Sequence, residues 1–198
     1  MKKINLAILF LFLITACSPD TFLLNKNSSF ADSRVIFGFK MNELDSVEVT
    51  GENSLALHKG AIVGLALDNI TQLHCDITCE LTQGTFIRFA TRTIGAEYEK
   101  QKGITFDYST ANSVISYNGE VIRTVDSIKA ELNKPSRIHI LNDGNLLNVI
   151  VNCDTVFYGK VFIPATEYLI VETPNNSTAK LSGIIFSSLR ESDNKKVD

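Results

Sequence analysis

The segment Leu147-Asn148-Val149-Ile150-Val151-Asn152-Cys153-Asp154-Thr155-Val156-Phe157 alternates between two kinds of side chain. Its odd positions are Leu, Val, Val, Cys, Thr and Phe, whereas its even positions are mostly Asn or Asp. Successive side chains of a β-strand point to opposite faces, so this period of two is typical of a strand with one buried side. The stretch therefore predicts a half-buried strand, bent near residues 152–154, with Cys153 on the inward side.

Similar runs lie on both sides of this segment. In Cys75–Leu81, Cys, Ile, Cys and Leu alternate with Asp, Thr and Glu, and pairs such as Asn118-Gly119 and Asp143-Gly144 supply turns between runs. No convincing long amphipathic helix is found. The pattern predicts an all-β fold, an antiparallel two-sheet β-sandwich. The other expected strands are Val35–Phe39, Leu55–Leu67 (two strands), Thr85–Thr91, Ile104–Tyr108, Ser113–Tyr117, Val121–Val125, Arg137–Leu141, Tyr168–Val171 and Ala179–Leu189.

The N-terminal segment has the features of an export signal. Lys2 and Lys3 precede the apolar run Leu6–Ile14, which is shorter than the roughly 20 residues that a membrane-spanning helix needs. The tetrapeptide Ile14-Thr15-Ala16-Cys17 resembles the lipobox of bacterial lipoproteins. That resemblance implies cleavage before Cys17 and fatty-acyl chains, palmitate among them, on the cysteine. The alternative is an ordinary secretory signal that happens to contain a cysteine.

These patterns divide the chain into four parts. We expect a lipoprotein signal peptide at 1–16, a lipidated Cys17 and tether over 17–33, a β-sandwich domain over 34–189 and a polar tail at 190–198. Ser18, in place of Asp, resembles the residue that directs lipoproteins to the outer membrane of Gram-negative bacteria. Both the periplasmic and the outer face of that membrane are compatible with the sequence.

The charge of the chain disfavours nucleic acid as a partner. Residues 1–16 contain two lysines, so Lys+Arg falls from 19 to 17 after cleavage against 22 acids, and the net charge moves from −3 to −5. No basic run or patch is found, and nucleic-acid-binding domains usually carry one. The expected partners are the membrane, through the lipid on Cys17, and a glycan or envelope protein.

Three further cysteines lie in the predicted sandwich. Cys75 and Cys79 are four strand residues apart, roughly 13 Å, whereas a disulfide needs Cα atoms within about 7 Å. One of them, Cys79 in our prediction, would instead pair with Cys153. The alternative is that all three are free thiols buried as small apolar groups.

From residue 76 to residue 189 the order of segments resembles the concanavalin A-like lectin/glucanase jelly roll, in particular its 3-keto-disaccharide hydrolase-like and laminin G-like members. Three blocks carry the resemblance: an early strand pair, a central hairpin with a DG turn in which Cys153 stands where Gly is usual, and the closing strands. These blocks are Asp76–Leu81 with Gly84–Phe89, Pro135–Ile140 with Gly144–Asp154, and Glu167–Glu172 with Ala179–Phe186.

The sequence predicts no catalytic residue, no metal ligand and no cofactor. Glycosidases of this fold carry a tight acidic cluster on one strand, and none stands here; Glu97 and Glu99 lie in a polar stretch that is typical of a loop. No phosphate-binding loop or zinc spacing is found. If the face carrying the arginines is concave, we expect a groove for a polar ligand lined by Arg88, Arg92, Tyr108 and His139.

The function that fits these observations is a lipid-anchored, non-catalytic module of the cell envelope that binds glycan or another envelope component. The absence of Trp counts against a glycan, because exposed aromatic rings usually support sugar binding. One alternative is a polysaccharide-acting glycosidase or lyase with an unrecognised site. A second alternative is a purely structural envelope lipoprotein.

Overall fold

The computed structural model describes residues 21–23, 35–38, 46–51, 54–67, 72–91, 103–162 and 168–187. These residues form β-strands and turns, and no helix among them is long and apolar enough to cross a membrane. The strands are β1 (Thr21–Leu23), β2 (Val35–Gly38), β3 (Val47–Gly51), β4 (Ser54–Leu57), β5 (Ile62–Leu67), β6 (Gln72–Gln83), β7 (Phe86–Thr91), β8 (Ile104–Ser109), β9 (Ser113–Tyr117), β10 (Glu120–Val125), β11 (Ser136–Asp143), β12 (Leu146–Val151), β13 (Asp154–Lys160), β14 (Tyr168–Glu172) and β15 (Thr178–Ser187).

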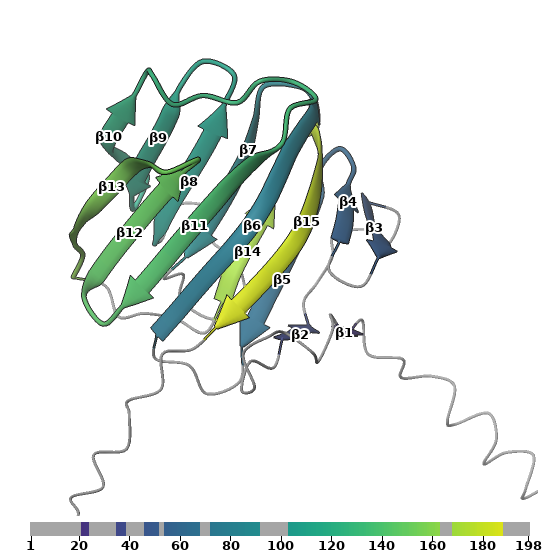
Figure 1. Cartoon of the computed structure of the whole chain (residues 1–198), viewed down its shortest axis with the longest axis horizontal. Helices are drawn as coiled ribbons and strands as arrows, with labels where there is room; N and C mark the ends of the chain where they lie inside the picture. Colours follow the sequence, from purple (N-terminus) through teal and green to yellow (C-terminus); the bar gives the residue numbers. More distant parts are fainter. Residues whose placement is uncertain are drawn as a thin grey trace, which may run out of the picture.

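The strands form two antiparallel sheets that pack face to face (Figure 1). The eight-stranded sheet has the order β1-β2-β5-β14-β7-β8-β9-β10, and the seven-stranded sheet has the order β13-β12-β11-β6-β15-β4-β3. Both β14 and β15, the last two strands, lie inside their sheets between strands formed much earlier in the chain. The predicted all-β, two-sheet sandwich is confirmed.

The alternating pattern of the sequence becomes the core. On β6, Cys75, Ile77, Cys79 and Leu81 are at most 1% exposed, whereas the residues between them are half-buried on the outer face. A layer of such residues from each sheet fills the space between the sheets. Polar groups also bridge it: Asn142 of β11 donates a hydrogen bond to Thr91 of β7, and both side chains are buried.

Two-residue turns join the consecutive strands of the meanders. Asn118-Gly119 connects β9 to β10 with φ angles of 49° and 84°, and Asn152-Cys153 connects β12 to β13 with φ angles of 50° and 76°. Positive φ at both central residues is the requirement of a type I′ hairpin turn. The segment expected as one bent strand over 147–157 is thus two strands and a tight turn.

Two strands were absent from the sequence prediction. Thr21–Leu23, inside the expected tether, forms β1 and pairs with β2, while Val47–Gly51 forms β3 and pairs with β4. Val47 and Val49 alternate with Glu48 and Thr50, but this run has only two apolar residues, and four of the five residues of β3 are exposed. The division of the chain into signal, tether, domain and tail stays a prediction, because residues 1–20 and 188–198 lie outside the described part.

Candidate ligand-binding face

The outer face of the seven-stranded sheet carries a cluster of ionisable side chains on two neighbouring strands. Antiparallel register places His139 of β11 opposite Asp76 of β6, with Arg137 opposite Thr78 two residues along. Inward residues on the same strands, such as Ile138, are buried, so the polar residues between them must point outwards. We call the four residues His74, Asp76, Arg137 and His139 the histidine cluster.

The centre of the cluster is an ion pair. Nε of Arg137 donates hydrogen bonds to Oδ1 and Oδ2 of Asp76 at 2.9 and 3.1 Å, and Nη2 donates a further one to Oδ2. The hydrogen bond from Arg137 lowers the pKa of Asp76, against a smaller opposing effect of burial. The same bond raises the pKa of Arg137. Asp76 is therefore a fixed carboxylate that holds the guanidinium in one orientation.

Two imidazole rings lie next to this pair. Nδ1 of His139 is 3.6 Å from Oδ2 of Asp76, and the ring of His139 stacks on that of His74 with centroids 6.1 Å apart. The pKa of His74 is lowered, mainly by burial and then by the neighbouring His139, although Asp76 acts in the opposite direction. A positive charge on His139 therefore disfavours the protonated form of His74.

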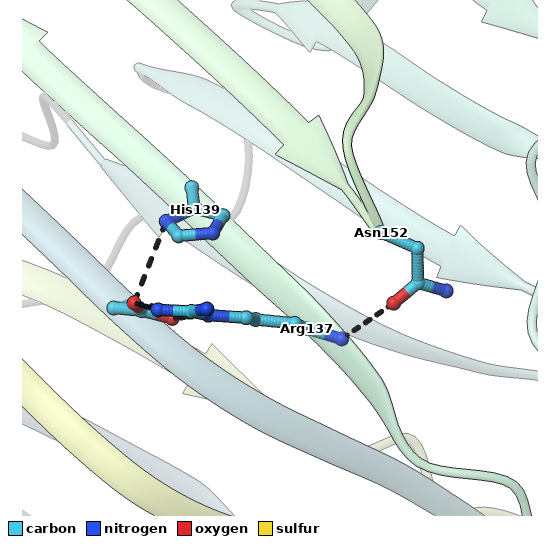
Figure 2. Close-up of polar contacts among 4 residues, drawn as sticks. Arg137, His139 and Asn152 are labelled. Atoms are coloured by element: carbon cyan, nitrogen blue, oxygen red, sulfur yellow. Dashed lines mark hydrogen bonds and ion pairs between the residues drawn. The ribbon is translucent and has the colours of Figure 1, made fainter.

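The backbone of Arg137 is fixed from the next hairpin. Oδ1 of Asn152 accepts a hydrogen bond from the Arg137 amide at 2.8 Å, and Nδ2 of Asn152 donates to Oγ of Ser136 at 3.2 Å. Figure 2 shows Asn152 contacting the backbone end of Arg137, while the guanidinium extends towards the His139 side. Arg137 is thus anchored at both ends, yet 63% of its side chain is exposed.

An aromatic ring and an amide lie farther along the same face. Tyr158 of β13 lies opposite Asn148 of β12 and is 67% exposed. Asn148 is at one of the outward-facing positions of β12. Oδ1 of Asn148 is buried and has no hydrogen-bond partner. A buried acceptor without a donor costs free energy, so a hydrogen bond donated to this oxygen by a ligand hydroxyl or a water molecule is favourable.

A second polar group lies on the outer face of the eight-stranded sheet. Arg88 of β7 donates two hydrogen bonds to the Asp107 carboxylate of β8, at 2.6 and 2.7 Å, and its Nη1 is 3.9 Å from Glu172 of β14. The arginine also covers the Phe86 ring at 5.5 Å. These side chains are only 10 to 23% exposed. The group therefore presents little free polar surface.

The structure does not bring the predicted groove residues together. Arg88 and His139 lie on the outer faces of opposite sheets, and Arg92 lies outside the described residues. Tyr108 is only 2% exposed, because its strand position faces the core. Its hydroxyl donates to the Lys129 carbonyl at 3.1 Å and forms a hydrogen bond with Ser136 Oγ at 2.8 Å. The prediction of one groove shared by these four residues is wrong. The lipidation site, Cys17, also lies outside the described part of the chain.

The cysteine prediction is corrected in a similar way. Cys75, Cys79 and Cys153 are free thiols, so the expected Cys79–Cys153 disulfide is not formed. Cys79 is buried, and burial raises its pKa to about 12, whereas Cys153 is exposed in the β12–β13 turn. The prediction of an inward Cys153 fails because the turn interrupts the alternation. Among the described residues, no group of three or more His, Cys, Asp or Glu side chains is arranged to hold a metal ion.

The sequence reasoning missed most of the histidine cluster. His74 was given no role in ligand binding, and Asp76 and Arg137 were assigned to strands without one. Their proximity depends on the β6–β11 pairing, which joins residues about 60 positions apart and is not visible in any local pattern. The one local signal was that each strand carries two ionisable residues at i and i+2, which alternation places on one face.

Comparison with solved structures defines the class of fold. The carbohydrate-binding module CBM66 from Bacillus subtilis is similar to this chain with a TM-score of 0.52 and 10% identity, covering 68% of this chain and 86% of that one. A putative glycosyl hydrolase from Parabacteroides distasonis gives a TM-score of 0.55 and 9% identity, covering 74% and 95%. The Emp47p carbohydrate recognition domain gives 0.51 and 13%, covering 84% and 92%.

These likenesses establish a jelly-roll β-sandwich fold. The fold is shared by carbohydrate-binding modules, lectin domains and glycosidases. No protein-family model matches the chain, and no curated protein matches it in sequence. At identities near 10% the shared property is the fold, so an argument about function depends on the site.

Proposed function

We propose that this protein is a non-catalytic carbohydrate-binding module of the cell envelope, held at a membrane by lipid on Cys17. The observation that carries the binding proposal is the outer face of the seven-stranded sheet, where an anchored Arg137, two imidazoles and an exposed Tyr158 lie on β11, β6 and β13. Sugars offer hydroxyl groups for such donors and acceptors and apolar ring faces for an aromatic side chain.

The geometry supports a ligand that extends over several strands. Strands β13, β12, β11 and β6 are neighbours in the sheet, and adjacent strands lie about 4.8 Å apart. A ligand that contacts both Tyr158 and the histidine cluster therefore crosses β12 and β11, a span of roughly 10 to 15 Å. That span favours an oligosaccharide over a single sugar.

Binding is tested with the soluble 18–198 form on a panel of envelope and environmental polysaccharides. We expect binding to at least one of them, weakened by Tyr158→Ala and by Arg137→Gln and unchanged by Lys59→Gln, a substitution in the β4–β5 turn. Circular dichroism of each variant checks that the sandwich is intact. Absence of binding to every polysaccharide would remove the glycan assignment and favour a structural envelope protein.

The anchor proposal rests on the N-terminal sequence pattern. We expect that cells supplied with labelled palmitate incorporate it into the full chain but not into Cys17→Ala. We also expect the wild-type protein to fractionate with the outer membrane, since Ser18 follows the modified cysteine. Labelling of neither protein would leave an ordinary secretory signal as the better interpretation.

Cleavage of polysaccharide is the alternative function, and its best candidates are Asp107 and Glu172. They flank Arg88 on strands β8 and β14, and two strand spacings place their backbones roughly 10 Å apart. Nε and Nη2 of Arg88 donate to the two oxygens of the Asp107 carboxylate, so this acid is held in a two-bond ion pair. Turnover that Asp107→Asn and Glu172→Gln both abolish would favour the enzyme.

A further inference from the structure

We infer that the histidine cluster selects glycans that carry carboxylate groups and binds them more tightly in mild acid than at neutral pH. This inference rests on the proposed carbohydrate-binding function and specifies its ligand. It follows from the arrangement of charges around Arg137.

Arg137 retains a free edge for a ligand. Its Nε and Nη2 donate to Asp76, while Nη1 makes no hydrogen bond to the described residues. The guanidinium cannot rotate away without breaking the pair, so the donors on its outer edge have a fixed direction. A second carboxylate, supplied by the ligand, matches the planar geometry of that edge better than a hydroxyl group does.

Protonation of the two histidines changes the net charge of this face, because the nearby Arg137 and Lys180 are each paired with an acid. Asp76 balances Arg137, and Glu80 balances Lys180, whose Nζ is 3.6 Å from the Glu80 carboxylate. Asp143 lies on the outer side of β11, four residues along the strand from His139, and Lys160 is an exposed cation at the end of β13. Each protonated imidazole adds one positive charge to the face beside Arg137.

Histidine is the residue type in this cluster that can change charge near neutral pH. Histidines titrate between about pH 5 and 8, and Asp76 remains ionised throughout because its pKa is lowered. Burial lowers the pKa of His74, so its charge develops at a lower pH than that of an ordinary histidine. A bound carboxylate near the rings favours their charged forms, so protonation and binding of an acidic glycan reinforce each other.

The test compares polygalacturonate with its fully methyl-esterified form, which has the same sugar ring and no charge. Binding of each to the 18–198 form is measured by calorimetry at pH 7.5 and 5.5. We expect the acid form to bind at least about fivefold more tightly at the lower pH, since a unit charge at about 4 Å in water changes affinity by that order. The ester should bind more weakly and with no pH dependence.

Variants assign the effect to the cluster. His139→Gln and the double variant His74→Gln/His139→Gln should lose most of the pH dependence while still binding polygalacturonate at pH 7.5. Arg137→Lys should weaken binding of the acid form at both pH values, because a lysine cannot present a planar edge. His58→Gln is the matched control: His58 is an exposed histidine near Glu48, outside the cluster, and its removal should leave the pH dependence intact.

The outcomes separate the two proposals. Equal binding of acid and ester at both pH values would retain carbohydrate binding and reject the inference. If the binding of polygalacturonate by the double histidine variant still depends on pH, the inference is also rejected. If neither polymer nor any neutral polysaccharide binds at either pH, the proposed function itself fails.

Discussion

Cys153 occupies in the β12–β13 turn the position that Gly119 occupies in the β9–β10 turn, and their φ angles are 76° and 84°. An Asn precedes each of them, with φ angles of 50° and 49°. The two hairpins therefore use one turn geometry, but only one of them has the residue that adopts it without a steric cost.

This relationship predicts that Cys153→Gly stabilises the protein. A left-handed conformation costs an L-residue roughly 1–2 kcal/mol, and the extra freedom of glycine in the unfolded chain offsets part of the gain, so we expect about 0.5–1 kcal/mol. Urea unfolding of both proteins measures the difference. The reverse substitution, Gly119→Ala, should destabilise by a similar amount, because space for a Cβ exists there and only φ is unfavourable.

Asp76→Asn should remove a pH-dependent part of the stability. Asp76 has a lowered pKa in the folded protein, so its contribution is present above the unfolded-state pKa of about 4 and is lost as the pH falls further. We expect the variant to be less stable at pH 7 by about 0.5–1 kcal/mol, the range for a pair largely screened by solvent. The two proteins should approach equal stability as the pH falls through the lowered pKa of folded Asp76. A constant difference across this range would contradict the assignment.

Tyr108→Phe should destabilise the sandwich without changing ligand binding. The hydroxyl of Tyr108 bonds Ser136 of the opposite sheet and the Lys129 carbonyl, and the substitution leaves these partners in a part-buried site. We expect a loss of about 1–2 kcal/mol by chemical denaturation. An unchanged affinity for the glycan would agree with a core position, whereas a weakened one at unchanged stability would return Tyr108 to the binding site.

Asp107→Asn tests whether the Arg88 group is structural. Both hydrogen bonds from Arg88 are charge-assisted and only partly exposed to water, so the substitution should cost about 1–3 kcal/mol of unfolding free energy. Arg88→Lys should have a comparable effect, because an ammonium group cannot make the two-bond contact. Stable variants that lose a measurable turnover would instead place the group in a catalytic site.

The sequence predicted the strands well where alternation was strong and failed where it was weak or where pairing mattered. Strands such as β6 and β8 alternate along their whole length, so their positions were visible. Tyr108 was misassigned because a groove was assumed without the register. That register places Asp107, not Tyr108, opposite Arg88. Cys153 was misassigned because its odd number continued the alternation of Val149 and Val151 through a turn that reverses the chain.

The candidate face required information that no local pattern contains. His74 and His139 become neighbours only through the pairing of β6 with β11, and Tyr158 joins them only because β12 and β13 follow in order. Single residues on each strand were compatible with an ordinary solvated surface. The fixed orientation of Arg137 by Asp76 and Asn152 distinguishes this face.

The central positions of β14 and β15 determine when the molecule can fold. Without residues 168–187, the eight-stranded sheet separates into β1-β2-β5 and β7-β8-β9-β10, and the seven-stranded sheet separates into β3-β4 and β6-β11-β12-β13. Neither sheet can close until these late segments reach strands made about 100 residues earlier, so native pairing is dominated by non-local contacts and is slow. Under the proposed export, both sheets would stay incomplete until residues 168–187 have crossed the membrane.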